Sequence, residues 1–170
     1  MKRILMTALA ALTLAAYVPA DAHARRPGRA VLHGDMTIEK DSRRDEDVLT
    51  DGALTVNGTL AADAVSLGGP VMVGGLVTGD VSSMGGPVTI TGRAADDVSS
   101  FGGPITVAGE VSGDVSSLGG PVLVSGHVAG DISSLGGNVK LTSGAVVDGD
   151  ISTMGGLVEK EDGAVHRGSV

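Results

Sequence analysis

The stretch GDVSSLGGPVLVSGHVA, residues 113–129, recurs along the chain with small changes. A Gly-Gly pair marks each copy, and successive pairs are 17 residues apart until the last step, which is 19 residues. A more divergent copy precedes the first pair. We count six to seven copies between about Asp45 and Val165. A short fixed period of this kind is typical of a solenoid, in which each repeat forms one coil that packs on its neighbours.

Each copy is too short for a strand and a helix, and Gly and Pro stand where a helix would break. Triplets such as Val71-Met72-Val73 and Val88-Thr89-Ile90 instead have the two-residue period of a strand with one buried face. Three turn signals per copy predict an all-β fold, a single-stranded β-solenoid (β-helix) of about six to seven 17-residue coils. Equivalent residues of adjacent coils would then lie about 4.8 Å apart.

Stacked coils bring like side chains into columns, and burial of each aliphatic side chain contributes about 1.5–3 kcal/mol. We predict four inward columns of Val, Ile, Leu and Ala. They are Val71, Val88, Ile105, Val122, Val139 and Val158; Val73, Ile90, Val107, Val124 and Leu141; Val77, Ala94, Val111 and Val128; and Val81, Val98, Val115, Ile132 and Ile151.

A fifth column holds the largest apolar side chains of the repeat. Val81 and Met84 are three residues apart, so strict alternation would direct Met84 outward unless the chain bends at Ser82-Ser83. We expect the bend and place this column in the core; without it, the column would form an exposed apolar stripe suited to association. The column is Leu67, Met84, Phe101, Leu118, Leu135 and Met154.

The composition agrees with a core of small aliphatic side chains. Of 170 residues, 28 are Gly, and the only aromatic residues are Tyr17 and Phe101. The chain has no Cys, which excludes disulfides, thiolate metal sites and cysteine nucleophiles.

The first residues have the pattern of an export signal. Lys2 and Arg3 precede an apolar run from Ile4 to Val18, and Ala22-His23-Ala24 provides the small residues that signal peptidases recognise. The run is shorter than the ~20 residues of a membrane-spanning helix. We therefore predict a signal peptide at 1–24, and no membrane-spanning segment after its cleavage.

The charges divide the remaining chain. We assign 25–47 to a basic and charged N-terminal arm and cap, 48–158 to the solenoid and 159–170 to a charged C-terminal tail. The span from Asp45 to Val158 has 13 acidic residues and only Arg93 and Lys140 as bases. An acidic body without aromatic stacking platforms argues against nucleic acid as a partner.

An Asp recurs once per copy, and stacked carboxylates either have raised pKa values or recruit cations. We expect each Asp to bond local backbone amides at a corner; a cation site is the alternative, although the Gly-Gly-x-Gly-x-Asp motif of calcium-binding repeats is absent. We assign no catalytic, cofactor or metal site. The ladder is Asp63, Asp80, Asp97, Asp114, Asp131 and Asp150.

Two hydroxyl columns follow the same period, the inner one including Ser83 and Ser100 and the outer one Ser82 and Ser99. A serine nucleophile needs a base within hydrogen-bond reach, and the only His within a repeat is His127, in a variable outward position. We therefore expect the serines to form hydrogen-bonded ladders at a corner, and no enzymatic activity.

The repeat Gly-Asp-Val-Ser-Ser-Leu-Gly-Gly-Pro-Val, followed by Val-x-Gly-x-Val, resembles the bactofilin family of polymer-forming cytoskeletal proteins over about residues 48–158. The resemblance implies a right-handed, roughly triangular β-helix that joins end to end into filaments and scaffolds the cell envelope. Bactofilins are cytoplasmic and lack signal peptides, whereas this chain begins with a predicted one.

Together these features lead us to expect an exported, non-enzymatic structural or scaffolding element of the bacterial cell envelope, periplasmic or secreted, for which end-to-end self-association and a monomer both stay open. The alternative is a surface or periplasmic adhesin-like module that binds polysaccharide or protein. The expected partners are further copies of the chain, a cell-wall polymer or an envelope protein. Both ends of the solenoid carry charged residues, which favours a monomer or a weak assembly.

Overall fold

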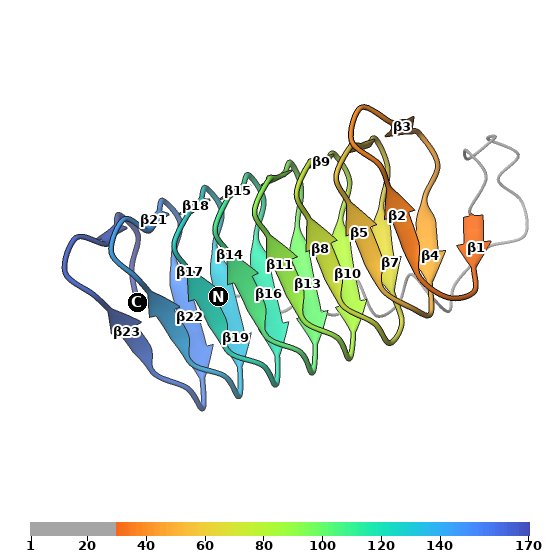
Figure 1. Cartoon of the computed structure of the whole chain (residues 1–170). Helices are drawn as coiled ribbons and strands as arrows, with labels where there is room; N and C mark the ends of the chain where they lie inside the picture. The colour runs from red at the N-terminus through yellow and green to blue at the C-terminus, as the bar shows by residue number, and fades with distance from the viewer. Residues whose placement is uncertain (1–29) are drawn as a thin grey trace, which may run out of the picture.

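The structure, a computed structural model, describes residues 30–170, and the predicted signal peptide lies outside them. Within this range the chain forms short β-strands joined by turns and bends. The strands lie in three parallel sheets of eight strands, and successive strands in the sequence belong to different sheets (Figure 1). Eight coils therefore stack into one β-solenoid, as the repeat predicts, with more coils than the six to seven that we counted.

Each coil contributes one strand to each sheet. Sheet A contains β1 (Ala30–Leu32), β4 (Val48–Thr50), β7 (Ala64–Ser66), β10 (Val81–Met84), β13 (Val98–Phe101), β16 (Val115–Leu118), β19 (Ile132–Leu135) and β22 (Ile151–Met154). Sheet B contains β2 (Met36–Ile38), β5 (Leu54–Val56), β8 (Val71–Val73), β11 (Val88–Ile90), β14 (Ile105–Val107), β17 (Val122–Val124), β20 (Val139–Leu141) and β23 (Val158–Lys160). Sheet C contains β3 (Arg43–Arg44), β6 (Thr59–Leu60), β9 (Leu76–Val77), β12 (Arg93–Ala94), β15 (Glu110–Val111), β18 (His127–Val128), β21 (Val146–Val147) and β24 (Val165–His166).

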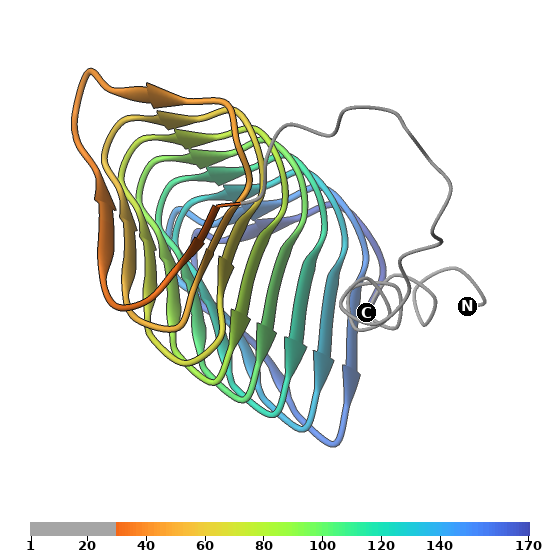
Figure 2. The same ribbon diagram turned by 90° about the vertical axis from the view of Figure 1, so that its right-hand side faces the viewer.

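The winding is right-handed. Seen from the N-terminal end, the chain runs clockwise around the three sheets as it recedes from the viewer (Figure 2). In the central coils each residue pairs with the residue 17 positions later, as Val88 does with Ile105. The Gly-Gly pairs consequently lie in a row along the corner between sheets A and B.

The solenoid extends beyond both of its predicted boundaries. Strands β1, β2 and β3 pair with β4, β5 and β6, so the described part of the predicted arm is the first coil. At the other end, β24 lies within the predicted tail and pairs with β21. The charged residues in these segments concealed the repeat, because they replace aliphatic residues at several positions.

The four predicted aliphatic columns form the core. Nearly all of their members are fully buried, including Val71, Val88, Ile105, Val122 and Val139 of the first column. Only Val158, in the last coil, is partly exposed. The same columns continue into the N-terminal coils through Leu54, Val56 and Leu60.

The prediction that the fifth column is core is wrong. Most of its side chains are about half exposed, for example Phe101 at 49% and Met84 at 45%, and Leu118 is partly exposed. They line the edge between sheets A and B. We call this set the apolar ridge: Leu67, Met84, Phe101, Leu118, Leu135 and Met154.

The cause of this error is the position of the bend. Strand β10 runs without interruption through Ser82 and Ser83, so alternation buries Ser83 and directs Met84 outward. The chain turns one residue later, at Gly85, whose φ of 124° is a conformation that glycine adopts without strain. The buried Ser83 hydroxyl donates to the carbonyl oxygen of Gly86 at 2.9 Å, which satisfies both groups inside the corner.

One pair of substitutions tests the inward and outward assignment. Val107 is fully buried in the second column, whereas Thr106 points outward from the same strand. Val107→Asp places an unpaired charge in the core, and we expect it to unfold the central coils, with a loss above about 3 kcal/mol. Thr106→Asp should change the free energy of unfolding by no more than about 0.5 kcal/mol.

Urea denaturation followed by circular dichroism measures both variants. Similar losses of stability in the two would contradict the assignment of β14.

Candidate functional site

The predicted Asp ladder exists, but its hydrogen bonds differ from the local corner bonds that we expected. The carboxylates of Asp63, Asp97, Asp114 and Asp131 each accept a hydrogen bond from the backbone N–H of the ladder residue in the next coil. The N–H of Asp114 donates to Oδ1 of Asp97 at 2.7 Å, and that of Asp131 donates to Oδ1 of Asp114 at 2.8 Å. The ladder therefore joins coils along the corner between sheets C and A, rather than shaping one corner at a time.

These bonds require a small residue before the Asp. A Cβ on Gly113 or Gly130 would overlap Oδ1 of the preceding Asp. Where Ala62 takes the glycine position, the bond from the N–H of Asp63 to Asp47 lengthens to 3.3 Å. Steric room at one position thus controls the geometry of each step.

Asp96 is the exception among the central coils, since it stands where its neighbours have glycine. The hydrogen bond from the N–H of Asp97 to the Asp80 carboxylate is too weak to offset the effects that raise the pKa of Asp80. Carboxylate oxygens of Asp80, Asp96 and Asp97 come within 4.8 Å of one another.

This crowding changes the acidity of the group. Partial burial of the carboxyl, together with the negative charges of Asp63, Asp96 and Asp97, raises the pKa of Asp80 to about 6. Burial also raises the pKa of Asp97. Raised pKa values are expected of stacked carboxylates, but the repeat pattern does not indicate that Asp96 concentrates the effect at Asp80.

Three carboxylates supply only part of a divalent-cation site, because Ca²⁺ takes six to eight oxygen ligands. Asp80 and Asp96 are exposed and Asp97 is partly buried. Of the other ladder residues, Asp114 and Asp131 each accept the backbone N–H of the next coil at their carboxylate, and donate their own N–H to the carboxylate of the preceding coil. The cluster therefore forms where two adjacent coils meet and does not recur along the rod.

The inner serines are structural. Ser66, Ser83, Ser100, Ser117 and Ser134 are buried, and each donates its hydroxyl proton to the carbonyl oxygen of the second Gly in its own Gly-Gly pair, at 2.6–2.9 Å. Of the expected ladder of hydroxyl-to-hydroxyl contacts, the described residues form one step, in the outer column, where the hydroxyl oxygens of Ser82 and Ser99 lie 2.9 Å apart.

His127 is held on the outer face of sheet C. Its Nε2 lies 2.9 Å from Oδ2 of Asp148, and Arg167 contacts the other oxygen of that carboxylate. Hydrogen bonds from His127 and Arg167 hold the pKa of Asp148 below its usual value. Within residues 30–170 the hydrogen bonds of the His127 ring involve no serine hydroxyl. This cluster is therefore an ion-pair group between the last coils, and its imidazole is not paired with the serine nucleophile that covalent catalysis would need.

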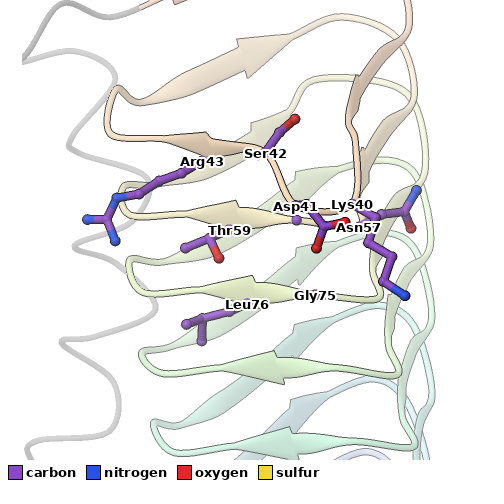
Figure 3. Close-up of a pocket in the computed structure, with 9 residues that line it drawn as sticks. Lys40, Asp41, Ser42, Arg43, Asn57, Thr59, Gly75 and Leu76 are labelled. Carbon is purple, nitrogen blue, oxygen red and sulfur yellow. The ribbon is translucent and has the colours of Figure 1, made fainter.

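A depression of about 390 Å³ lies beside sheet C in the first three coils (Figure 3). It forms because the first coil has a longer corner, with residues 39–42 between β2 and β3, whereas the next coil has only Asn57 and Gly58 there. Lys40, Asp41 and Asn57 in its lining are exposed, and the side chain of Arg43 extends away from them in Figure 3. Exposed groups of this kind do not converge on a bound molecule.

The distribution of charge over the rod is more distinctive. Four segments of the central coils contain no Asp, Glu, Lys, Arg or His: residues 64–79, 81–92, 98–109 and 115–126. Their outward residues on sheets A and B, together with the ridge between these sheets, form a surface that we call the uncharged side. The charged groups of these coils all lie on sheet C or at its corner with sheet A. The uncharged side could have been predicted from the sequence, because the charged positions are confined to one part of each 17-residue repeat.

In comparisons with protein-family models, curated proteins and solved structures, nothing matches this chain. The resemblance to bactofilins thus rests on the repeat alone and stays a prediction. Residues 30–170 form no helix of the length and apolar character that crossing a bilayer requires.

The raised pKa of Asp80 predicts a pH dependence of stability. Because the folded state raises this pKa from 3.8 to about 6, it favours the protonated carboxyl, and its contribution to stability is complete below pH ~4 and is lost as the pH rises through about 6. We expect the stability of the unmodified protein, relative to Asp80→Asn, to fall by about 1 kcal/mol between pH 4 and 7, a value reduced for solvent screening.

Thermal unfolding of both proteins across this pH range provides the measurement. A difference that stays constant with pH would refute the assignment.

A second prediction separates steric crowding from charge at position 96. Asp96→Gly restores the repeat glycine, so we expect the N–H of Asp97 to bond Asp80 fully and the pKa of Asp80 to fall, although desolvation and the charge of Asp63 keep it above its ordinary value. Asp96→Asn removes the charge but keeps the Cβ, so the pKa should fall only in part. Carboxyl chemical shifts followed by NMR during a pH titration report both values; an unchanged pKa in Asp96→Gly would exclude this cause.

Proposed function

We propose that the protein is an exported, non-enzymatic structural rod that acts as a scaffold in the bacterial cell envelope. The observation that carries this proposal is the uninterrupted stacking of eight coils with very short corners. Most central corners between sheets B and C have only two residues, such as Thr91 and Gly92. Enzymes built on β-helices place their catalytic groups on longer loops, and coils of this kind offer none in their central part.

The rigidity of the rod suits a scaffold. Adjacent coils are joined by backbone hydrogen bonds in three sheets and by the Asp ladder at one corner. The described coils span roughly 34 Å along the axis at ~4.8 Å per coil. A rod of this length can hold two partners at a fixed separation.

The ends of the described solenoid determine whether rods join end to end. In the first coil, the N–H of Met36 and the carbonyl of Ile38 bond the second coil. The N–H of Thr37 therefore lies on the outer edge, because bonding directions alternate along a parallel strand. Such an edge can pair with another strand, and this favours end-to-end assembly.

Charged residues at both ends oppose that assembly. Arg44 stands in the third column next to Leu60, Lys160 in the second next to Leu141, and His166 in the third next to Val147. These basic groups interrupt the apolar columns at the last coil on each side. We infer that end-to-end contacts form through backbone pairing and are weak.

The export part of the proposal is supported by Lys2, Arg3, the apolar run and the Ala22-His23-Ala24 site. The scaffold and filament parts are supported by the resemblance of the repeat to the bactofilin family. An exported protein with a bactofilin-like repeat would form the same kind of structural rod outside the cytoplasm.

Expression of the full chain in a bacterium tests the proposal. We expect the protein in the envelope fraction, with Arg25 as its first residue, and as filaments in electron micrographs. Thr37→Pro removes the outer-edge N–H and should shorten the filaments, whereas Thr37→Ala, which keeps the N–H, should not. Retention of residues 1–24 on a cytoplasmic protein would contradict export, and isolated rods at all concentrations would contradict filament formation.

A further inference from the structure

The apolar ridge has no partner among the described residues. Leu67, Met84, Phe101 and Leu135 are each 45–49% exposed, and Met154 is 66% exposed. Exposed apolar side chains are ordinary when scattered, but here they form one continuous row over six successive coils, one per coil. A contiguous row of this kind indicates a surface that is covered in the working form of the protein.

In the central coils the surroundings of the ridge are also free of charge, whereas Asp51 stands beside Leu67 at one end and Lys140 continues the outer row of sheet B at the other. Exposed prolines follow the Gly-Gly pairs, at Pro70, Pro87, Pro104 and Pro121, and form a second apolar column on the far side of the corner. The outward serines of sheet A and the Met72, Thr89, Thr106 and Leu123 row of sheet B flank them. Such a surface can be desolvated without burying an unpaired charge.

We propose that the apolar ridge is the contact surface on which a second copy of this chain packs side by side with the first. This inference goes beyond the proposed function, because a lateral contact uses neither end of the rod. It assigns the uncharged side to an interface between two identical rods.

The spacing of the ridge favours a second copy over other occupants. Its side chains repeat at the coil spacing, ~4.8 Å, and a partner must have the same spacing to fill the gaps between them along the whole row. A second copy of this chain has the same spacing because its coils stack in the same way. A self-complementary contact of one patch with itself is the usual geometry of a symmetric dimer.

Charge favours the same occupant. The chain has a net charge of −8, so two copies repel each other in most orientations. Contact through the uncharged side places both acidic corners, with Asp80, Asp97 and Asp114, on the far sides of the pair. In this orientation the acidic corners of the two rods are as far apart as possible, so their electrostatic repulsion is smallest.

The size of the surface is sufficient for a dimer. Six large apolar side chains, most of them about half exposed, contribute on the order of 500 Å² of apolar surface. The flanking Pro, Ser and Thr columns bring the total toward the roughly 800 Å² that each partner buries in a standard interface.

Analytical ultracentrifugation of the full chain over a range of concentrations tests the inference. We expect a dimer, and about tenfold or greater weakening of dimerisation in Phe101→Lys/Leu118→Lys, because these positions lie at the centre of the ridge. The matched control is Ala95→Lys/Ala129→Lys, which adds the same charge at exposed positions outside the ridge. Residues 1–29 are identical in both variants, so any association through them is common to both.

A second measurement does not depend on affinity. Because the chain has no Cys, a single Phe101→Cys should form disulfide-linked dimers under mild oxidation, whereas Ala95→Cys should not. Circular dichroism must show that all variants keep the melting temperature of the unmodified protein to within a few degrees; Phe101→Ser serves in place of the lysine variant if they do not.

Three results would overturn the inference. They are a monomer at every concentration, equal dimerisation of the ridge and control variants, and ridge-dependent binding of a monomer to neutral phosphatidylcholine vesicles or to a neutral polysaccharide. Dimers without filaments would support the lateral contact and remove only the end-to-end part of the proposed function.

Discussion

Parallel backbone pairing between successive coils is the constraint on which the rest of this structure depends. Each strand bonds the equivalent strand of the next coil in strict register, so the side chain at each repeat position lies over its own equivalent. Each side chain must therefore pack or form hydrogen bonds favourably next to a similar side chain of the adjacent coil. Aliphatic side chains satisfy this condition by packing into columns, and the buried serines satisfy it by bonding glycine carbonyls within their own coil. The aspartates satisfy it only by accepting a backbone N–H from the next coil.

The same constraint explains why one irregular residue has a local effect. A side chain at the glycine position of a corner disturbs the contact with the preceding coil, as Asp96 does at Asp80. Neither neighbouring step of the ladder is lost, since Asp80 still bonds Asp63 and Asp114 still bonds Asp97. Nearest-neighbour coupling of this kind is characteristic of solenoids, and it lets such a rod carry a distinct chemical group on one coil without loss of the fold.

Much of the fold could be predicted from the sequence because a fixed period determines which residues stack. The period identified the four aliphatic columns, the Asp ladder and the row of Gly-Gly corners. It could not locate the bend. The strand continues to Met84 and the chain turns at Gly85 instead of at Ser82-Ser83, so alternation directs the Met84 side chain outward instead of into the core. The first coil and the end of the last coil were missed because Arg44 and Lys160 occupy aliphatic positions there, so only backbone pairing reveals them.

A distance between two spin labels tests the stacking most directly. Thr55 and Leu123 point outward from sheet B and are joined by four successive pairings, through Met72, Thr89 and Thr106. With cysteine labels at these two positions, pulsed electron paramagnetic resonance should give a narrow distribution corresponding to about 19 Å between the backbones, which is four coil spacings. A broad distribution, or one centred beyond about 30 Å, would show that the coils do not stack in this register.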